Sequence, residues 1–405
     1  MPRLAALLLA LASLPAALPA QGGITVTDDV SAQVSAQRIT VQVSGTDAAL
    51  TEQVRQALAL HGAFAVSTSS GVRVNLDRAG AGARVTCAQP GYAFETEVQG
   101  RDTGELALRA ADAAVVGLGS RFKLRPLFAD TRVAFLSRLG VGRHEVYAGN
   151  LLMRGVRPLT RLNCENQGPR WSADGNRVFF VSYAKGVPDL YSAPYPFGEP
   201  RPVIAGLRGT LSGGAASPDG RRLAFSSSNL GKTLDLYVAE VNGANPRCIV
   251  RSPDRVESDA AWSPDGTQVV FASGAGGSPR LHVVPAAGGT PTQLATGGGY
   301  ASEPSWNRVD RKLVAFTQAG EGTNSVAVLN LEQGTVAVAG QGSAAVAYSR
   351  PSWCADGRHL VVQSQRRGTD SYWLSLVDSV TGKVSRLTGE ALPACKQPDC
   401  WFPRR

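Results

Sequence analysis

The stretch AWSPDGTQVVF, residues 261–271, decides the fold. Pro264 fixes φ for the first central position of a type I turn, and Gly266 can take the left-handed conformation that closes a three-residue hairpin loop. Trp262 stands before this turn and the Val-Val-Phe run 269–271 stands after it, and such residues favour a pleated, half-buried surface. The stretch therefore predicts a β-hairpin.

The same phrase recurs at a regular interval. It reads WSADG at Trp171, ASPDG at Ala216, WSPDG at Trp262, WNRVD at Trp306 and WCADG at Trp353, with spacings of 45, 46, 44 and 47 residues. Each copy is followed by two further strand-like runs and, after a turn, by a fourth short strand. Four strands in a unit of about 45 residues are typical of a propeller blade. We interpret each Trp as a packing residue between neighbouring blades and each Asp-Gly as a turn former.

The ends of the array determine the number of blades. A unit begins at RVAFLS, residues 132–137, without a Trp phrase, and Trp401 lies 48 residues after Trp353, where the next Trp belongs. If the C-terminal strand completes the first blade, the ring closes and no sheet edge stays exposed. The fold class is therefore predicted as mainly β, with a six-bladed β-propeller of four-stranded blades over residues 129–405.

The region before the repeats has a different texture. Arg3, an apolar run at residues 4–14 and a small residue at Ala20 predict a signal peptide over residues 1–20, and hence export from the cytoplasm. Residues 21–128 alternate strand-like and helix-like segments, which predicts a small N-terminal α/β (α+β) domain. Its first part, the polar residues 22–38, is expected to be a mobile arm. After residue 20 no apolar run approaches the roughly 20 residues that a membrane helix needs.

The charge is modest and evenly spread. The chain has 41 Lys and Arg against 32 Asp and Glu, a formal net charge of +9, with no run of five basic residues. Nucleic-acid binding would need a concentrated basic stripe, so it is not expected. An acidic protein partner or an anionic envelope surface fits this charge better.

Six cysteines are compatible with an oxidising compartment. Six cysteines allow 15 pairings, and the sequence does not choose among them. Cys395 and Cys400, in CKQPDC, are close enough along the chain to be the candidate for a local disulfide. A metal site is not expected, because this pair lacks a second pair of ligands and the four histidines are scattered.

These features together resemble the TolB family, the periplasmic six-bladed propeller proteins of the Tol-Pal cell-envelope system. The resemblance rests on the signal peptide, the small α/β domain, the W-S-P-D-G repeats with Leu-Tyr in the third strand, the bridge RFKLRPLFADTRVAFLS (121–137) and a chain end just past a Trp. It implies a periplasmic, non-enzymatic scaffold without a cofactor, which is a monomer and at most peripheral to the membrane. The implied role is support of outer-membrane integrity and of envelope constriction during cell division.

The resemblance also implies partners and a binding site. The partners are a peptidoglycan-associated lipoprotein at the mouth of the propeller channel and an inner-membrane Tol protein reached by the N-terminal arm. In that family the contact residues lie three to six positions before the repeat's Trp. Those positions supply the candidate partner-binding residues Glu165, Asn166, Glu257, Ser258, Asp259, Tyr300, Ser302, Glu303, Tyr348, Ser349 and Arg350. Tyr300 and Tyr348 are the preferred anchors, because exposed aromatic residues beside polar groups are usual at interfaces.

Several alternatives stay open at this stage. The candidate residues could be ordinary polar linkers, and Glu165, Asp259 and Glu303 could instead hold a cation in the channel. A propeller of this kind could bind glycan or peptidoglycan fragments, or serve as the accessory propeller of a peptidase system. A peptidase of its own would need a nucleophile elbow, and the chain contains no Gly-x-Ser-x-Gly.

Overall fold

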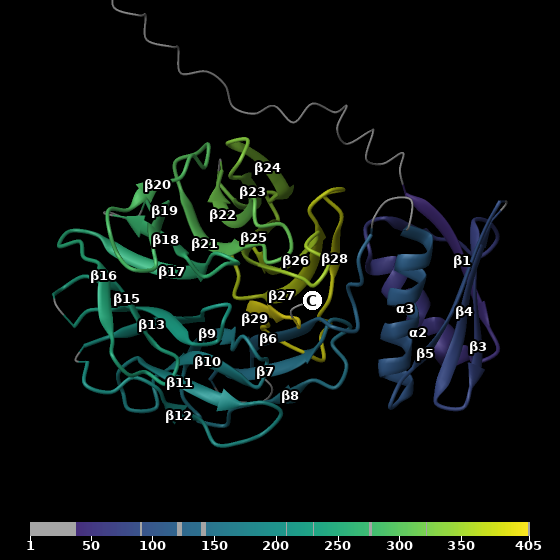
Figure 1. Cartoon of the computed structure of the whole chain (residues 1–405), viewed down its shortest axis with the longest axis horizontal. Helices are drawn as coiled ribbons and strands as arrows, with labels where there is room; N and C mark the ends of the chain where they lie inside the picture. The colour runs from purple at the N-terminus through teal and green to yellow at the C-terminus, as the bar shows by residue number, and fades with distance from the viewer. Residues whose placement is uncertain are drawn as a thin grey trace, which may run out of the picture.

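The computed structural model describes residues 38–89, 91–119, 124–138, 143–207, 209–229, 231–274, 278–320 and 322–403. It contains a small mixed α/β domain beside a six-bladed β-propeller, which confirms the predicted fold class (Figure 1). The predicted signal peptide lies outside the described residues, and so does the predicted arm except for Arg38.

The N-terminal domain is one sheet covered by two helices. Its strands are β1 (Ile39–Gly45), β2 (Phe64–Val66), β3 (Val72–Ala79), β4 (Gly82–Gln89) and β5 (Tyr92–Gln99), in the order β2-β1-β3-β4-β5. Strand β1 runs parallel to β2 and β3, and the other pairs are antiparallel. Helices α2 (Ala48–Leu60) and α3 (Thr103–Gly119) lie between the sheet and the propeller (Figure 1). Neither helix, nor any other among the described residues, is long and apolar enough to cross a membrane.

Local capping explains where the two helices begin. The Asp47 carboxylate accepts a hydrogen bond from the backbone N–H of Leu50 at 2.9 Å, and the Asp102 carboxylate accepts one from the N–H of Glu105 at 2.8 Å. Each bond satisfies an N–H that has no partner inside its helix. Glu105 reaches back to the N–H of Arg101, one residue before the position that a capping box uses.

The propeller consists of six four-stranded antiparallel sheets. Blade 1 is β29 (Lys396–Trp401), β6 (Arg132–Ser137), β7 (Glu145–Asn150) and β8 (Arg157–Pro158); blade 2 is β9 (Asn166–Trp171), β10 (Arg177–Ser182), β11 (Asp189–Pro194) and β12 (Arg201–Pro202); blade 3 is β13 (Leu211–Ala216), β14 (Arg222–Ser227), β15 (Asp235–Glu240) and β16 (Arg247–Val250). Blade 4 is β17 (Val256–Trp262), β18 (Gln268–Gly274), β19 (Arg280–Pro285) and β20 (Thr292–Gln293); blade 5 is β21 (Ala301–Trp306), β22 (Leu313–Ala319), β23 (Asn324–Asn330) and β24 (Thr335–Gly340); blade 6 is β25 (Val346–Trp353), β26 (His359–Arg366), β27 (Tyr372–Asp378) and β28 (Val384–Arg386). The C-terminal strand β29 therefore supplies the innermost strand of the first blade.

The repeated phrase is a hydrogen-bonded turn. The Ser263 hydroxyl donates to the Asp265 carboxylate at 2.6 Å and accepts from the backbone N–H of Gln268 at 2.9 Å, while Gly266 has φ of 72°. Hydrogen bonds from Ser263 and from Thr267 lower the pKa of Asp265 to about 2. The same Ser-to-Asp bond recurs in the hairpins of blades 2 and 3. In these three hairpins the turn therefore uses a Ser, an Asp and a Gly at fixed positions, whereas Asn307 and Cys354 occupy the Ser position in blades 5 and 6.

The Trp residues of the phrase pack between blades, as the sequence predicts. Trp262 donates its indole N–H to the carbonyl of Ala215 in blade 3 at 2.8 Å, and Trp353 donates to the carbonyl of Ser305 in blade 5 at 3.0 Å. Trp401 donates to the carbonyl of Ala173 in blade 2 at 3.0 Å. These three innermost strands are thus hydrogen-bonded to a neighbouring blade, whereas Trp306 donates to the carbonyl of Arg311 within its own blade.

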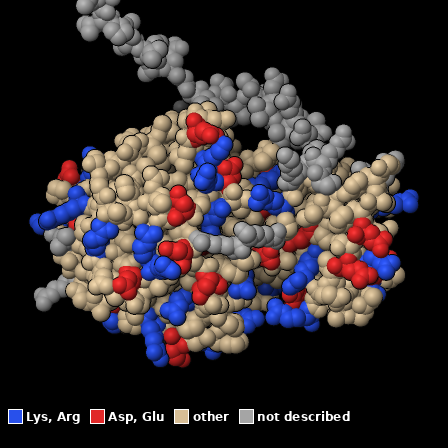
Figure 2. Space-filling view, in the orientation of Figure 1, with Lys and Arg blue, Asp and Glu red and all other residues tan. Residues whose placement is uncertain are grey.

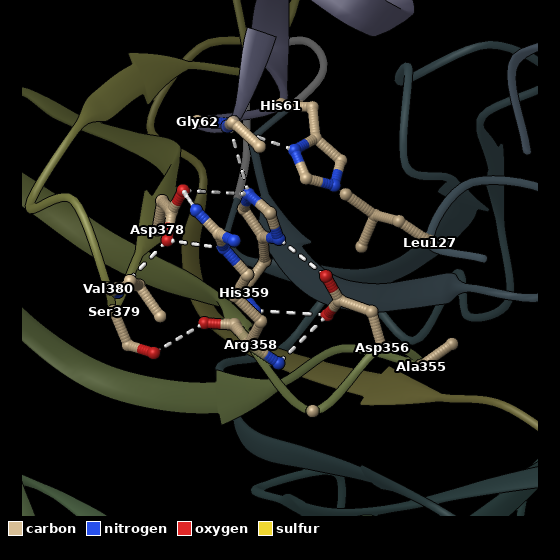
Figure 3. A network of polar contacts seen from close by, with 12 residues as sticks. His61, Gly62, Leu127, Ala355, Asp356, Arg358, His359, Asp378, Ser379 and Val380 are labelled. Carbon is tan, nitrogen blue, oxygen red and sulfur yellow. Dashed lines mark hydrogen bonds and ion pairs between the residues drawn. The ribbon is translucent and has the colours of Figure 1, made fainter. Parts of the chain in front are cut away.

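The N-terminal domain contacts the side of the propeller that carries the Trp-phrase hairpins, which we call the hairpin face. The backbone N–H of Gly62 donates to Nε2 of His359 at 3.3 Å, and His359 Nδ1 lies 2.6 Å from the Asp356 carboxylate (Figure 3). Arg358 forms two hydrogen bonds to the Asp378 carboxylate in the same network. Side chains of both domains share one apolar cluster, so the contact is continuous with the core of the molecule.

His61 is the titratable group at the centre of this contact. Its ring is fully buried, 4.4 Å from the ring of His359, and Nδ1 accepts from the backbone N–H of Ala63. Burial lowers the pKa of His61 well below its ordinary value, and the neighbouring His359 and Arg358 charges lower it further, against the Asp356 and Asp378 carboxylates, which raise it. The folded protein therefore holds His61 neutral, whereas the unfolded chain protonates it below about pH 6.5.

We expect this difference to make the protein less stable in mild acid. Because folding lowers the pKa of His61, the unfolded chain binds more protons than the folded protein in mild acid. The folded protein therefore has its full stability above about pH 6.5 and loses part of it as the pH falls. His61→Asn keeps an acceptor for the N–H of Ala63 and cannot titrate. Between pH 7.5 and 5.5 the wild type should lose about 1 kcal/mol more unfolding free energy than His61→Asn, measured by urea denaturation. Equal losses in both proteins would contradict this role of His61.

Candidate functional site

Each innermost strand contains a β-bulge shortly before its Trp position. The register of the strand pair shifts at the same place in all six blades. The bulged residues with left-handed φ, between 52° and 77°, are Gly168, Gly213, Asp259, Glu303, Arg350 and Gln397. Four of these residues are not glycine, and the left-handed conformation costs energy for a residue with a side chain. Such strained positions are typical of functional sites. We call these six residues the bulge rim.

Charged side chains of the bulge rim meet across the blades. Arg350 Nε lies 3.0 Å from Glu303 Oε1, and Arg350 Nη1 lies 4.0 Å from Asp259 Oδ1. The backbone N–H of Arg350 also donates to Glu303 Oε2 at 3.0 Å, and the Thr317 hydroxyl donates to the same oxygen at 2.6 Å. One guanidinium from blade 6 therefore connects carboxylates of blades 5 and 4.

The electrostatics of this group favour the charged guanidinium. Burial by itself lowers the pKa of Arg350, but the Glu303 and Asp259 carboxylates raise it above its ordinary value. The Arg350 side chain keeps 29% of its surface exposed, the Asp259 side chain 27% and the Glu303 side chain 15%, so a partner can still reach all three. The group can therefore offer one positive and two negative charges to a docking surface.

The closing strand completes the bulge rim. Gln397 Oε1 accepts from the backbone N–H of Gly168 at 2.6 Å, and the backbone N–H of Gln397 donates to Gln363 at 3.1 Å. Gly168, Glu303, Arg350 and Gln397 line one small cavity of about 10 Å³. Residues from four blades therefore meet at this small cavity. Gln397 is not among the predicted site residues, because the candidates come only from the segments before Trp171, Trp262, Trp306 and Trp353, although Gln397 lies four positions before Trp401.

Three of the sequence-predicted partner-binding residues are buried. Asn166 has no exposed surface and donates to the backbone carbonyls of His144 and Cys164, while Glu257 is 1% exposed and Ser302 4%. These three side chains are buried while their neighbours are exposed, because successive side chains of a strand point to opposite sides of the sheet. A bulge shifts this alternation. These three side chains therefore lie inside the propeller, and one buried carboxylate oxygen of Glu257 has no hydrogen-bond partner among the described residues.

The two tyrosines are only half exposed. The Tyr300 hydroxyl accepts a hydrogen bond from the hydroxyl of Ser302 at 3.1 Å, and Tyr348 packs against the apolar cluster shared by blades 5 and 6. Burial raises the pKa of Tyr348. Each tyrosine is therefore only partly exposed, and part of the Tyr348 ring serves the packing of blades 5 and 6.

The remaining candidates support the bulge rim or the seam between blades. Ser258 donates to the Asp259 carboxylate at 3.0 Å, and Ser349 accepts from Gln363 at 3.2 Å. Glu165 lies 3.0 Å from Nδ1 of His144 and 3.7 Å from Nζ of Lys396, so it joins blade 2 to blade 1. Glu165 and Lys396 form a second, partly exposed charge group beside the bulge rim.

The channel beyond the bulge rim is narrow. The Trp residues and the ends of the innermost strands line a cavity of about 110 Å³. On its wall, Asp399 of the closing strand accepts from the backbone N–H of Trp171 at 2.8 Å and pairs with Arg170 at 3.2 Å, and Ser352 donates to it at 3.3 Å. Asp399 thereby joins blade 1 to blades 2 and 6. This volume is below the roughly 300 Å³ at which ligand pockets usually begin.

The carboxylates of the bulge rim are arranged for a guanidinium. Asp259 and Glu303 share Arg350, and Glu165 is engaged elsewhere with His144 and Lys396. Within the described part of the chain, the one cluster with metal-ligand side chains is His61, Asp356 and His359 on the hairpin face. Within this cluster, Asp356 and His359 are hydrogen-bonded to each other (Figure 3).

All six cysteines are free thiols in the structure, so the candidate bridge between Cys395 and Cys400 is not formed. Cys400 lies within β29 and Cys395 directly precedes this strand. An extended segment of five residues spans on the order of 15 Å, whereas bridged Cα atoms lie about 4.4–6.8 Å apart. Extended backbone therefore separates two cysteines that are close in sequence.

The fold and the bulge rim define a class: six-bladed propellers closed by their C-terminal strand and carrying a small α/β domain. A family model described as "TolB beta propeller domain" matches residues 128–399, which is more than half of the chain. The chain belongs to the TolB family.

Comparison with individual proteins agrees with this assignment. "Tol-Pal system protein TolB" of Desulfosudis oleivorans is 39% identical over 66 residues, which are 16% of this chain and 15% of that protein. The protein of the same name from Anaeromyxobacter dehalogenans strain 2CP-C is 32% identical over 140 residues, 34% of this chain and 30% of that protein. The chain thus matches less than a third of the length of either curated relative.

Solved structures show the same fold. The crystal structure of TolB from Acinetobacter baumannii superposes with a TM-score of 0.77 at 18% identity, over 91% of this chain and 97% of that one. A putative TolB from Agrobacterium tumefaciens gives a TM-score of 0.53 at 19% identity, over 64% and 88%. The first similarity covers the N-terminal domain as well as the propeller.

Proposed function

We propose that this protein is a non-enzymatic periplasmic scaffold of a Tol-Pal-like envelope system, which binds a peptidoglycan-associated lipoprotein at the bulge rim. Through this contact it supports outer-membrane integrity and envelope constriction during cell division. The polar residues 22–38 reach an inner-membrane Tol protein in this proposal. The observation that carries the proposal is the charged group of Arg350, Glu303 and Asp259 on strained bulges at one mouth of a TolB-family propeller.

The position of the N-terminal domain supports this choice of surface. Gly62 bonds to His359, Lys383 donates to the carbonyl of Ala59, and Arg154 donates to Gln56. These propeller residues belong to the hairpin face, so the described part of the N-terminal domain leaves the bulge rim uncovered. On the face drawn in Figure 2, basic and acidic side chains are interspersed with wide uncharged areas, which suits a protein partner.

The direct test is binding of the purified chain to the soluble domain of the peptidoglycan-associated lipoprotein from the same bacterium, followed by calorimetry. We expect saturable binding in a one-to-one ratio. Binding to purified cell-wall sacculi, together with no binding to the lipoprotein domain, would replace this proposal by the glycan-binding alternative. At the bulge rim itself the cavity lined by Glu303, Arg350 and Gln397 holds only about 10 Å³, which is small for a sugar chain, so we prefer the protein partner.

Reversal of one charge should weaken this binding. Arg350→Glu puts a third carboxylate beside Glu303 and Asp259, and we expect the dissociation constant to rise at least about tenfold. The matched control is Arg221→Glu, the same change at an exposed residue in a hairpin of blade 3 on the opposite face. Circular dichroism verifies that both variants fold. An equal loss of affinity in both variants, or in neither, would contradict the assignment of the bulge rim.

A further inference from the structure

Two buried cysteines lie where the last blade meets the first. Cys354 directly follows Trp353 at the end of β25, and Cys400 precedes Trp401 in the closing strand β29. Cys354 is fully buried, Cys400 is 8% exposed, and both belong to one apolar cluster. The neighbouring Cys400 thiol is one of the groups that raise the pKa of Cys354.

The backbone holds these two residues side by side. The N–H of Cys400 donates to the hydroxyl of Ser352 at 2.8 Å, and Ser352 is two residues before Cys354. In contrast, the Cys395 thiol donates to the carbonyl of Leu392 at 3.2 Å, at the other end of the strand. On one side β29 is hydrogen-bonded to β6, and on the other it contacts β25 through side chains. The two thiols therefore lie in the seam that joins the ends of the ring.

We propose that Cys354 and Cys400 form a disulfide that covalently locks the closing strand to the last blade. An S–S bond forms between the two Sγ atoms, and the thiols lose two protons and two electrons. A disulfide oxidant, either a thiol–disulfide oxidoreductase or glutathione disulfide, takes up both electrons and is reduced to two thiols. In the cell this step depends on the export assumed in the proposed function, but the chemistry can be tested on the purified protein.

The burial of both groups sets the order of events. Burial and the neighbouring thiol raise the pKa of Cys354, so little of the reactive thiolate exists once the seam has closed. An oxidant also cannot reach a fully buried sulfur. The exchange therefore takes place while β29 is undocked, during folding, and the finished bond then resists reduction.

Peptide mapping tests the pairing directly. The chain is refolded with glutathione disulfide, free thiols are alkylated in denaturant, and the product is cleaved with trypsin without reduction. Cleavage after Lys396 separates Cys395 (peptide 387–396) from Cys400 (peptide 397–404), and Cys354 lies in peptide 313–358. We expect a reducible cross-link between peptides 313–358 and 397–404. A cross-link from 397–404 to 387–396, or complete alkylation of Cys400 in the folded protein, would overturn the proposal.

Thermal unfolding gives a second measurement. A bond that closes a loop of this length should raise Tm, and we expect reduction to lower the Tm of the wild type by at least about 5 °C. Cys354→Ala should show no shift on reduction, whereas Cys164→Ser, a half-buried thiol in blade 2, should keep the full shift. If Cys354→Ala does not fold, the wild-type peptide map decides alone. The purified protein could form the disulfide while the protein in periplasmic extracts contains both cysteines as thiols. That result would contradict the assumed export and would still support the pairing of Cys354 with Cys400.

Discussion

Removal of the closing strand, residues 396–405, is expected to prevent the propeller from folding. The deletion exposes the hydrogen-bonding edge of β6 and removes Asp399, which accepts from the N–H of Trp171 and pairs with Arg170. It also removes Trp401, whose ring packs 6.4 Å from that of Trp171. An exposed strand edge beside an uncovered apolar seam promotes aggregation. Size-exclusion chromatography should show aggregate in place of the monomer.

A single substitution tests the contribution of the closing strand without removing any backbone. Trp401→Ala should lose about 3–5 kcal/mol of unfolding free energy in urea, because Trp401 is only 9% exposed and its ring lies under the Arg132 guanidinium. Trp373→Ala is the control, since Trp373 is a half-buried residue of β27 away from the seam. It should lose clearly less. A truncated chain with the Tm of the wild type would show that β29 does not close the ring.

Asp112→Ala is expected to give the second large loss of stability. Asp112 is a buried residue of α3 whose carboxylate accepts from the N–H groups of Leu127, Phe128 and Ala129 at 2.6, 2.8 and 2.8 Å. These residues belong to the connection between α3 and the first strand of the propeller. Burial raises the pKa of Asp112 to about 6, although the three N–H groups lower it.

Removal of this carboxylate leaves three N–H groups without their acceptor, so we expect a loss of at least about 3 kcal/mol in urea unfolding. Asp112→Asn retains one acceptor oxygen and should lose less. If both variants unfold at the same urea concentration as the wild type, the connection is held by its apolar contacts and not by these hydrogen bonds. The N-terminal domain should then stay docked on the hairpin face in both variants.

Much of the propeller could be predicted because its signals are local. Ser263, Asp265 and Gly266 form their turn with one another, so the phrase is readable without knowledge of its surroundings. The caps at Asp47 and Asp102 are local in the same way. The number of blades could be predicted because Trp401 stands at the repeat distance from Trp353, which places it in the next innermost strand.

The details of the candidate site depend on contacts between distant residues. Asp259, Glu303 and Arg350 lie on bulges, and a bulge exists only relative to the strand beside it. The burial of Asn166 and Glu257 depends on the strands packed around them and is not visible in the composition of the segment. The contact of Gly62 with His359 joins residues 297 positions apart, and neither histidine of this network carries a local signal.

The central claim is that a lipoprotein docks on the bulge rim, and crosslinking in living cells tests it most directly. A photoreactive amino acid replaces Tyr348, a half-exposed residue beside Arg350, and in a parallel strain replaces Phe197, which is 75% exposed in the connection between β11 and β12. The account predicts that the peptidoglycan-associated lipoprotein is trapped from position 348 and not from position 197, as identified by mass spectrometry. Trapping from position 197 alone, or of cell-wall fragments alone from position 348, would contradict it.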